Sequence, residues 1–435
     1  MHQILNKNRK ENKSGQPDDN SSKQGHPVMN SERMRSVDIL RGLVILVMIF
    51  VNDVYNIAGA PEMFLHVKYG HDGMSIADAV FPAFLFIVGL SMPFSLGKRL
   101  KNGESVQQIW EHVARRSALL ILIGFFMVNA ESIDRFNGFF DYRVWSFLMA
   151  AGVILFRIDF PRSYPWMSQV LKIFRITGVL LLVFLAFAYS SKNGAGLMQM
   201  RAHWWGIIGL IGWAYFVSAA VYIFFQKVPA GILGAAALLY CMYFADKAGM
   251  FQGLSFINNI VSIGPFLGTH SAICLSGAAL GILISENLHE KTHRCRITRA
   301  AVLGIGFAAA GYMLHSLSKM HPMFIISKLS ATPSWGLLSS AFTALAWVLI
   351  YIVSDVSKEN KVTKIMEHAG RNALMAYILS DLLIYGLTLL DVYYFRSDFY
   401  NSWGASMGLW RSLFFAFSVV LFAGVLERFR IRLRL

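Results

Sequence analysis

The sequence predicts an all-α, polytopic transmembrane helical bundle of about twelve spans. The 435-residue chain is 55% hydrophobic and 15% charged, whereas a soluble protein carries about 25% charged residues. Runs of about 20 apolar residues recur along nearly the whole chain, and each is long enough to cross the hydrocarbon core of a bilayer. The predicted spans are 38–57, 76–97, 116–131, 143–157, 173–191, 204–225, 229–247, 267–286, 299–317, 334–354, 373–395 and 407–426.

The charge pattern predicts the topology. The net charge is +15, and the basic residues cluster in loops between apolar runs, such as 98–116 and the C-terminal 428–435. These basic loops alternate with near-neutral ones, so twelve spans with both termini in the cytoplasm satisfy the positive-inside rule. Because the basic residues do not form one face or motif, we expect no nucleic-acid partner.

The distribution of polar and apolar segments predicts the domain organisation. Residues 1–34 are polar and lack an apolar signal-peptide core, so we expect a disordered cytoplasmic tail. Residues 35–430 should form a single transmembrane domain, and 431–435 a short basic cytoplasmic tail. The pair 204–225 and 229–247 reads as a helical hairpin, with Pro229 at the start of its second helix.

Few residues suggest metal or redox chemistry. Cys241, Cys274 and Cys295 lie far apart and form no CxxC motif, so we predict no metal site. Asp381 lies near the middle of the eleventh predicted span, where an ionisable group is costly and by default indicates function.

The segment 33–93 is the most informative for chemistry. Two apolar runs flank a loop with His66, whose residue type is suited to act as a base near neutral pH. Asn52 ends the first run and has an amide that can donate to a developing oxyanion. Asp78 enters the second run and can orient an imidazole. The alternative is structural: a solvated loop histidine, a helix-end Asn and an N-terminal helix acid.

The order of residues in this segment resembles a known family. Arg33, Arg35, Asp38, Arg41 and Gly42 lead into the run that ends at Asn52, and an Asp-Gly-Met-Ser string at 72–75 precedes Asp78. This pattern resembles the start of the catalytic domain of heparan-α-glucosaminide N-acetyltransferases and their bacterial relatives, within the transmembrane acyltransferase superfamily. Further matches follow in unbroken order at Arg116, Gly264, Leu267, Gly268, Thr269, Ser271, Lys328, Thr332, Ser334, Gly370, Asn372 and Tyr377.

The resemblance implies site residues. It gives His66 the catalytic role because its Phe-Leu-His context is similar to the family's motif, while His71 matches if the loop aligns differently. Asn52 and Asp78 are then its catalytic partners. The residues expected to bind the donor acetyl-CoA are Asp38, Arg41, Arg116 and Asn372. Those expected to bind the acceptor are Asp72, Thr269, His270 and Lys328.

The function that the resemblance implies is transfer of acetyl from cytosolic acetyl-CoA to the amine of glucosamine or a glucosaminide outside the cytoplasm. An O-acyltransferase of an extracytoplasmic glycan and an amino-sugar transporter are the alternatives. Eleven residues of helix separate Arg41 from Asn52, or roughly 16 Å, a depth that a pantetheine arm can thread. Acetyl transfer through an acetyl-histidine and direct transfer both remain open. We expect a multi-pass protein of a bacterial inner membrane, in contact with lipid, and a homodimer is compatible with this function.

Overall fold

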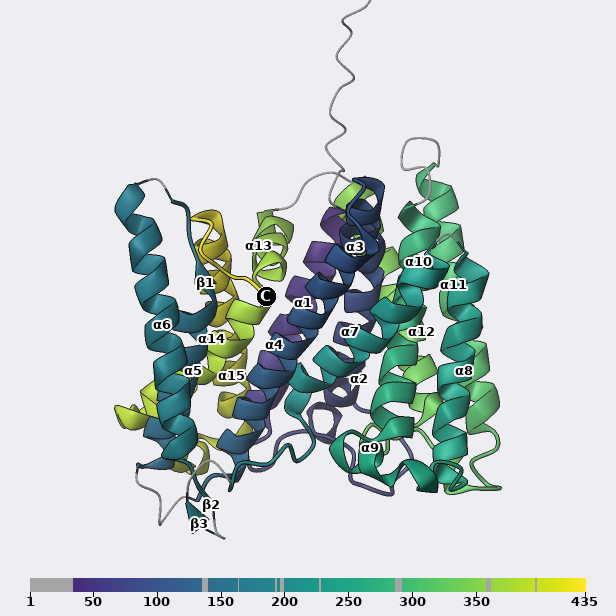
Figure 1. Cartoon of the computed structure of the whole chain (residues 1–435). Coiled ribbons are helices and arrows are strands. Elements are labelled where there is room, and N and C mark those ends of the chain that lie inside the picture. Colours follow the sequence, from purple (N-terminus) through teal and green to yellow (C-terminus); the bar gives the residue numbers. More distant parts are fainter. Residues whose placement is uncertain are drawn as a thin grey trace, which may run out of the picture. The chain divides into compact units, whose positions relative to one another are not determined.

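The computed structural model describes residues 34–134, 140–162, 164–191, 194–195, 199–226, 228–285, 292–356, 361–395 and 397–435. Apart from Met34, the predicted tail 1–34 lies outside the described residues. The rest is almost entirely helical (Figure 1). The α-helices are α1 Arg35–Val54, α2 Ile76–Leu90, α3 Met92–Lys101, α4 Val106–Ser132, α5 Tyr142–Arg157, α6 Pro165–Phe187, α7 Gly206–Phe225, α8 Pro229–Lys247, α9 Ser255–Ile260, α10 Ser271–Ser285, α11 His293–His315, α12 Pro333–Tyr351, α13 Lys361–Arg371, α14 Ala373–Leu389 and α15 Ser397–Arg428.

Shorter elements join these helices. Two are π-helical and continue into or out of a long helix: η4 Ile263–His270 leads into α10, and η6 Ile352–Val356 follows α12. Four 3₁₀ turns occur in the described chain, at Glu62–Phe64 (η1), Gln252–Leu254 (η3), Pro322–Phe324 (η5) and Tyr393–Phe395 (η7). The strands are β1 Ile158–Asp159, β2 Ser190–Ser191, β3 Gly194–Ala195 and β4 Arg432–Leu433.

The helices confirm a polytopic membrane protein. Within the described residues, nine helices are long and apolar enough to cross a bilayer, and the α13–α14 pair, bent by 86°, passes the same test as one unit. Each of the twelve predicted spans falls on a helix. The first, α1, carries Asp38, Arg41 and Asp53 within 20 residues, and the fourth, α5, has only 16 residues. Twelve crossings and the orientation of the termini therefore stay predictions.

Two local predictions can be compared with the structure. The segment 204–247 forms the expected helical hairpin, and α8 begins at Pro229, where the missing backbone N–H costs no hydrogen bond. The C-terminal segment 431–435, expected as a separate basic tail, includes β4, which pairs antiparallel with β1. The end of the chain is thus part of the same compact unit, which extends from Met34 to Leu435.

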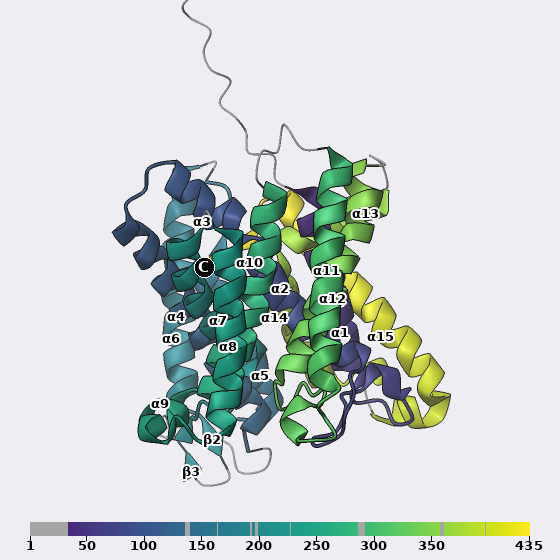
Figure 2. The ribbon, with the colours of Figure 1, turned by 90° about the vertical axis from the view of Figure 1, so that its right-hand side faces the viewer.

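The centre of the bundle is formed by α2 and α10, which cross at very short range. A Cβ atom on Gly277 of α10 would lie 1.9 Å from the Phe86 carbonyl oxygen, and one on Gly89 of α2 would lie 1.6 Å from the Cys274 carbonyl oxygen. Only glycine permits this approach, as is common where transmembrane helices pack without a hydrophobic driving force. The helices α6, α8 and α11 lie at the edge of the bundle (Figures 1 and 2), and only 28%, 22% and 22% of their spanning windows are buried.

A polar network fixes the first turns of α1 to α13 and α2. The buried Asp38 carboxylate accepts from Arg41 Nη1 at 3.0 Å and from Arg371 Nε at 3.2 Å. Arg41 Nη2 in turn donates to Ser91 Oγ at 2.6 Å, at the junction of α2 and α3. Gly370 approaches so closely that a Cβ there would lie 1.8 Å from the Asp38 carbonyl oxygen. The helices that surround the N-terminal end of α1 are therefore held by ion pairs as well as by packing.

The substitution Gly277→Ala should destabilise the protein, because the added methyl group meets backbone atoms of α2 that cannot move aside. Overpacking of this kind costs about 1–3 kcal/mol. We expect the melting temperature of the purified protein in detergent to fall by several degrees. The matched control is Gly306→Ala on α11, where a Cβ meets nothing within 4 Å. There alanine should stabilise the helix by about 0.5–1 kcal/mol. Equal melting temperatures for the two variants would contradict the crossing geometry.

Candidate active site

The Asp78 carboxylate organises the polar groups near the start of α2. Ser75 caps this helix in a capping box, in which its side chain accepts from the Asp78 N–H while the Asp78 carboxylate accepts from the Ser75 N–H at 3.2 Å. The same carboxylate accepts from the Val67 N–H at 3.1 Å and lies 2.8 Å from His66 Nδ1. Only 1% of the Asp78 side chain is exposed. An acceptor with this many donors is stable as an ionised carboxylate.

The contact with Asp78 determines which nitrogen of His66 is reactive. An ionised carboxylate can only accept, so Nδ1 of a neutral His66 carries the proton and donates to Asp78 Oδ1. The lone pair then resides on Nε2, which is the form that acts as a base or nucleophile. One third of the His66 side chain is exposed, so a substrate can approach it. The pair has the arrangement of a carboxylate that orients a catalytic imidazole.

Lys328 completes this cluster, which we call the Asp78 cluster: Asp78, His66 and Lys328. Its Nζ lies 3.2 Å from His66 Nδ1, 3.3 Å from Nε2 and 3.9 Å from Asp78 Oδ1. Burial lowers the pKa of Lys328 to about 8, although the nearby Asp78 charge opposes that shift. The residue comes from the segment between α11 and α12, outside the spanning helices, so the cluster joins two distant parts of the chain.

Asp72 holds these two segments together. Its carboxylate accepts from the Ile326 N–H at 2.8 Å and lies 2.8 Å from His315 Nε2. One residue further, the Gly73 N–H donates to the Ile326 carbonyl oxygen at 2.9 Å. The structure therefore gives Asp72, predicted to bind the acceptor, contacts that connect the loop after α1 to the loop after α11. This connection brings Lys328 to His66.

His71 and Asn52 occupy different settings. His71 is exposed, and its backbone N–H donates to the Lys68 carbonyl oxygen, whereas His66 has the carboxylate partner. Asn52 lies exposed near the end of α1, and its side chain hydrogen-bonds to Tyr377 of α14. The amide that was predicted to donate to an oxyanion thus also contacts α14.

Thr269 and His270 lie at the end of the π-helix η4 and are buried. The His270 ring stacks on Phe266 with centroids 5.4 Å apart and meets Phe81 and Trp335 edge-on. His270 thus packs against Trp335, whose Nε1 donates to the Asp78 carbonyl oxygen. Both side chains are buried, so they support the packing around the Asp78 cluster.

The residues predicted to bind the donor lie elsewhere. Asp38 and Arg41 belong to the ion-pair network at the N-terminal end of α1. Asn372 donates to the Ile431 carbonyl oxygen at 2.9 Å and so anchors the C-terminal segment. The Arg116 guanidinium lies over the Tyr215 ring, 4.8 Å from its centroid. Arg41 Nη1 also donates to the Gly370 carbonyl oxygen at 3.3 Å, two residues before Asn372. A donor-binding role for the four residues stays a prediction.

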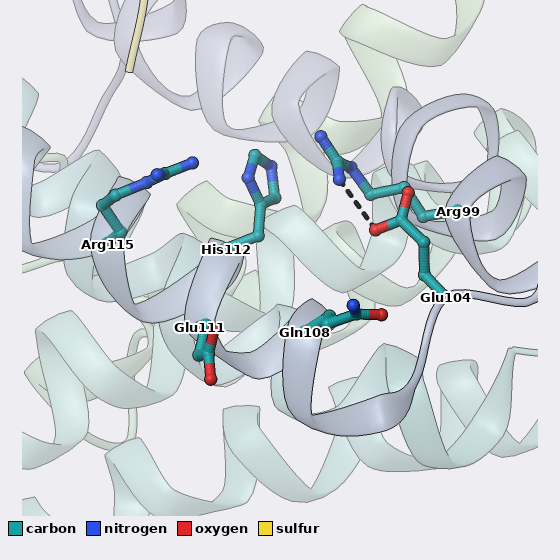
Figure 3. Close-up of a pocket in the computed structure, with 6 residues that line it drawn as sticks. All are labelled: Arg99, Glu104, Gln108, Glu111, His112 and Arg115. Atoms are coloured by element: carbon teal, nitrogen blue, oxygen red, sulfur yellow. Dashed lines mark hydrogen bonds and ion pairs between the residues drawn. The ribbon is translucent and has the colours of Figure 1, made fainter.

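A cavity of about 380 Å³ opens beside α3 and the first turns of α4. Figure 3 shows Arg99, His112 and Arg115 pointing to one side of it, with Glu104 paired to Arg99 at 2.8 Å. Gln108 and Glu111 complete the lining. This cavity was not predicted from the sequence, although the basic segment 98–116 that contains it was noted for its charge.

Residues 33–139 are similar to proteins of known function. The family model for the heparan-alpha-glucosaminide N-acetyltransferase catalytic region matches residues 33–139. The human heparan-alpha-glucosaminide N-acetyltransferase is 41% identical over 97 residues, and the mouse protein 39% over 137 residues. Residues 33–139 are therefore similar to this catalytic region. The human alignment covers 22% of this chain and 14% of the relative, and the mouse alignment covers 32% and 20%.

The matched region contains two of the three members of the Asp78 cluster. Asn52, His66, Asp72 and Asp78 fall within residues 33–139 of the heparan-α-glucosaminide N-acetyltransferase match. Lys328 lies outside it and reaches the cluster through the fold. Two further contacts were missed by sequence reasoning: His315 pairs with Asp72, and Trp335 Nε1 donates to the Asp78 carbonyl oxygen at 3.1 Å. No local motif marked either residue, because each partner lies more than 240 positions away.

The substitution Asp72→Ala should loosen the loop that carries Lys328, because it removes the acceptor for the Ile326 N–H and the partner of His315. We expect backbone amides of residues 316–332 to exchange hydrogen faster while the amides of α2 stay protected. Glu62→Ala is the control, since it removes an exposed carboxylate from the same loop. Unchanged exchange over 316–332 in the Asp72 variant would show that Asp72 does not fasten the two loops.

Proposed function

We propose that the protein is a transmembrane N-acetyltransferase that moves acetyl from cytosolic acetyl-CoA to the amine of glucosamine or a glucosaminide on the extracytoplasmic side. The single observation that carries the proposal is the Asp78–His66 pair within a segment that matches the family's catalytic region. The human and mouse relatives are named for acetyl transfer to a glucosaminide. The bilayer concerned would be a bacterial inner membrane.

The geometry of His66 suits acetyl transfer to an amine. Its Nε2 lone pair can accept the proton that the attacking amine loses, while Asp78 stabilises the imidazolium through Nδ1. The same lone pair can instead attack the thioester and carry the acetyl group itself. In both routes the carbon–sulfur bond breaks and the proton lost by the amine ends on the CoA thiolate. An acceptor that arrives as an ammonium ion releases one further proton to solvent.

Asn52 and the cationic residues are given supporting roles in this proposal. Asn52 would donate its amide to the thioester oxygen from the end of α1. Arg41 and Arg116 would meet the phosphates of acetyl-CoA, because guanidinium groups bind phosphate in a bidentate manner. Acetyl-CoA itself would thread along α1 from its Arg41 end toward His66. The acceptor would reach the exposed face of His66 from the opposite end of that helix.

The substitution His66→Ala should lower kcat for acetyl transfer by about 10²–10⁴-fold, because it removes the base or nucleophile. Binding of acetyl-CoA to the purified protein should change little, since the imidazole acts in chemistry. The matched control is His71→Ala, an exposed histidine five positions along the same loop, which should keep wild-type turnover. The reverse pattern in the two variants would move the catalytic role to His71.

Sidedness provides a second test. In right-side-out proteoliposomes with labelled acetyl-CoA in the lumen and glucosamine only in the bath, labelled N-acetylglucosamine should appear in the bath. The reason is that donor and acceptor would enter at opposite ends of α1. Activity that requires both substrates in one compartment would contradict transfer across the membrane. Unmodified glucosamine that accumulates in the lumen would support a transporter instead, and acetylated hydroxyl groups would support an O-acyltransferase.

A further inference from the structure

Lys328, which the resemblance assigns to acceptor binding, lies against the reactive imidazole itself. It lies 262 positions from His66 in the chain, yet its ammonium contacts that ring directly. Only 16% of its side chain is exposed, although long cationic side chains usually keep their charged end in water. Placing a lysine there costs desolvation, which indicates a use for the charge at this point.

The distances show where the ammonium sits on the imidazole. A donor on the lone-pair axis of Nε2 would lie much farther from Nδ1 than from Nε2. Lys328 Nζ is instead 3.3 Å from Nε2 and 3.2 Å from Nδ1, so it lies against the ring and off both lone-pair axes. The Nε2 lone pair stays open for a substrate, and the cation is adjacent to the atom at which bonds are made.

The charges around Lys328 come from three elements. Asp78 of α2 is 3.9 Å away, which is an ion-pair distance but too long for a hydrogen bond. His66 comes from the loop after α1, and the buried His270 of η4 also experiences the Lys328 charge. An ammonium group has three N–H donors. None is needed to neutralise Asp78 by a direct hydrogen bond, because that carboxylate already accepts from His66, Val67 and Ser75.

We propose that the Lys328 ammonium donates a hydrogen bond to the oxyanion formed during acetyl transfer, as a second donor beside Asn52. This role rests on the proposed function. When the amine adds to the thioester carbon, the π electron pair moves to the carbonyl oxygen and the amine proton passes to His66 Nε2. The oxyanion then reforms the carbonyl, the carbon–sulfur bond breaks, and the thiolate takes the proton from Nε2.

The position of Lys328 fits either route. In the acetyl-histidine route the carbonyl carbon is bonded to Nε2, so its oxygen forms beside Nζ. In direct transfer the amine nitrogen is hydrogen-bonded to Nε2, and the thioester carbonyl carbon that it attacks lies one bond beyond that nitrogen. A cation in a partly buried site stabilises an anion more strongly than one in water, and this stabilisation increases as charge develops in the transition state.

The role predicts an alkaline limit on turnover. The pKa of Lys328 is lowered to about 8 by burial, so the ammonium is present below that pH and is lost as the pH rises through it. Turnover of the wild-type protein should therefore fall above about pH 8. Deprotonation of the acceptor amine has the opposite sign, because it increases the nucleophile concentration with pH. A fall on the alkaline side thus reports loss of the cation.

The experiment measures kcat and KM against pH for the full-length protein in detergent, with acetyl-CoA and glucosamine. Lys328→Met should lower kcat by about 10²–10³-fold, which is the usual effect of losing one oxyanion donor, with KM changed far less. Lys328→Arg should keep more activity than the Met variant and lose the alkaline limb, because a guanidinium does not deprotonate in this range. Lys319→Met is the matched control: it removes an exposed lysine from the same loop and should match the wild type.

A readout that does not depend on activity accompanies the kinetics. Labelling of neutral amines by an N-hydroxysuccinimide ester, followed by mass spectrometry of the Lys328 peptide, should show a midpoint near pH 8. An alkaline limb that persists in Lys328→Arg would overturn the proposal, and so would a Lys328→Met variant that changes KM alone. If the Met variant does not fold, the Arg variant still decides. A folded wild-type protein without acetyl transfer at any pH would instead overturn the proposed function itself.

Discussion

The buried Asp78 carboxylate is the constraint on which the candidate active site depends. One charged group caps α2, fixes the loop at Val67, orients His66 and attracts Lys328. A buried carboxylate is tolerated only when its oxygens are satisfied by donors, so the loop, the imidazole and the helix start must all adopt one arrangement together. Trp335 strengthens it from α12 by bonding the Asp78 carbonyl oxygen. The orientation of His66 Nε2 is therefore a consequence of the hydrogen bonds that the Asp78 carboxylate needs.

The cluster also explains how a helical membrane domain can form a polar site without placing it in the hydrocarbon core. The groups that carry charge come from the start of α2 and from the two loops that follow α1 and α11. Burying unpaired charge within a membrane is costly, and the arrangement avoids this because every charged member has a partner. Asp72 adds a second link between the same loops, so the position of Lys328 does not depend on one contact.

At the opposite end of α1 the charged side chains are also paired, and there they pair with one another. Asp38 is shared by Arg41 and Arg371, and Glu367 pairs with Arg35 and Arg371. The Arg41 side chain is 19% exposed, whereas the Asn372 amide donates to the Ala423 and Ile431 carbonyl oxygens. Two of the residues expected at a donor site thus serve first to hold α1, α13 and the C-terminal segment. The cavity beside Arg99 and Arg115 is a separate opening near α3.

The sequence by itself determined the fold class, the approximate places of the twelve apolar segments and the pair His66 and Asp78. It could do so because hydrophobic runs report membrane burial residue by residue, and because the two site residues lie twelve positions apart in one motif-bearing segment. The choice between His66 and His71 could not be made from residue types, since both are loop histidines. Only the tertiary structure brought Lys328, His315 and Trp335 to Asp72 and Asp78, across more than 240 positions of chain. Such contacts depend on how α12 packs against α2 and α11 against α12. Helix packing is decided by close approaches like that of Gly89 and Gly277, which no local pattern encodes.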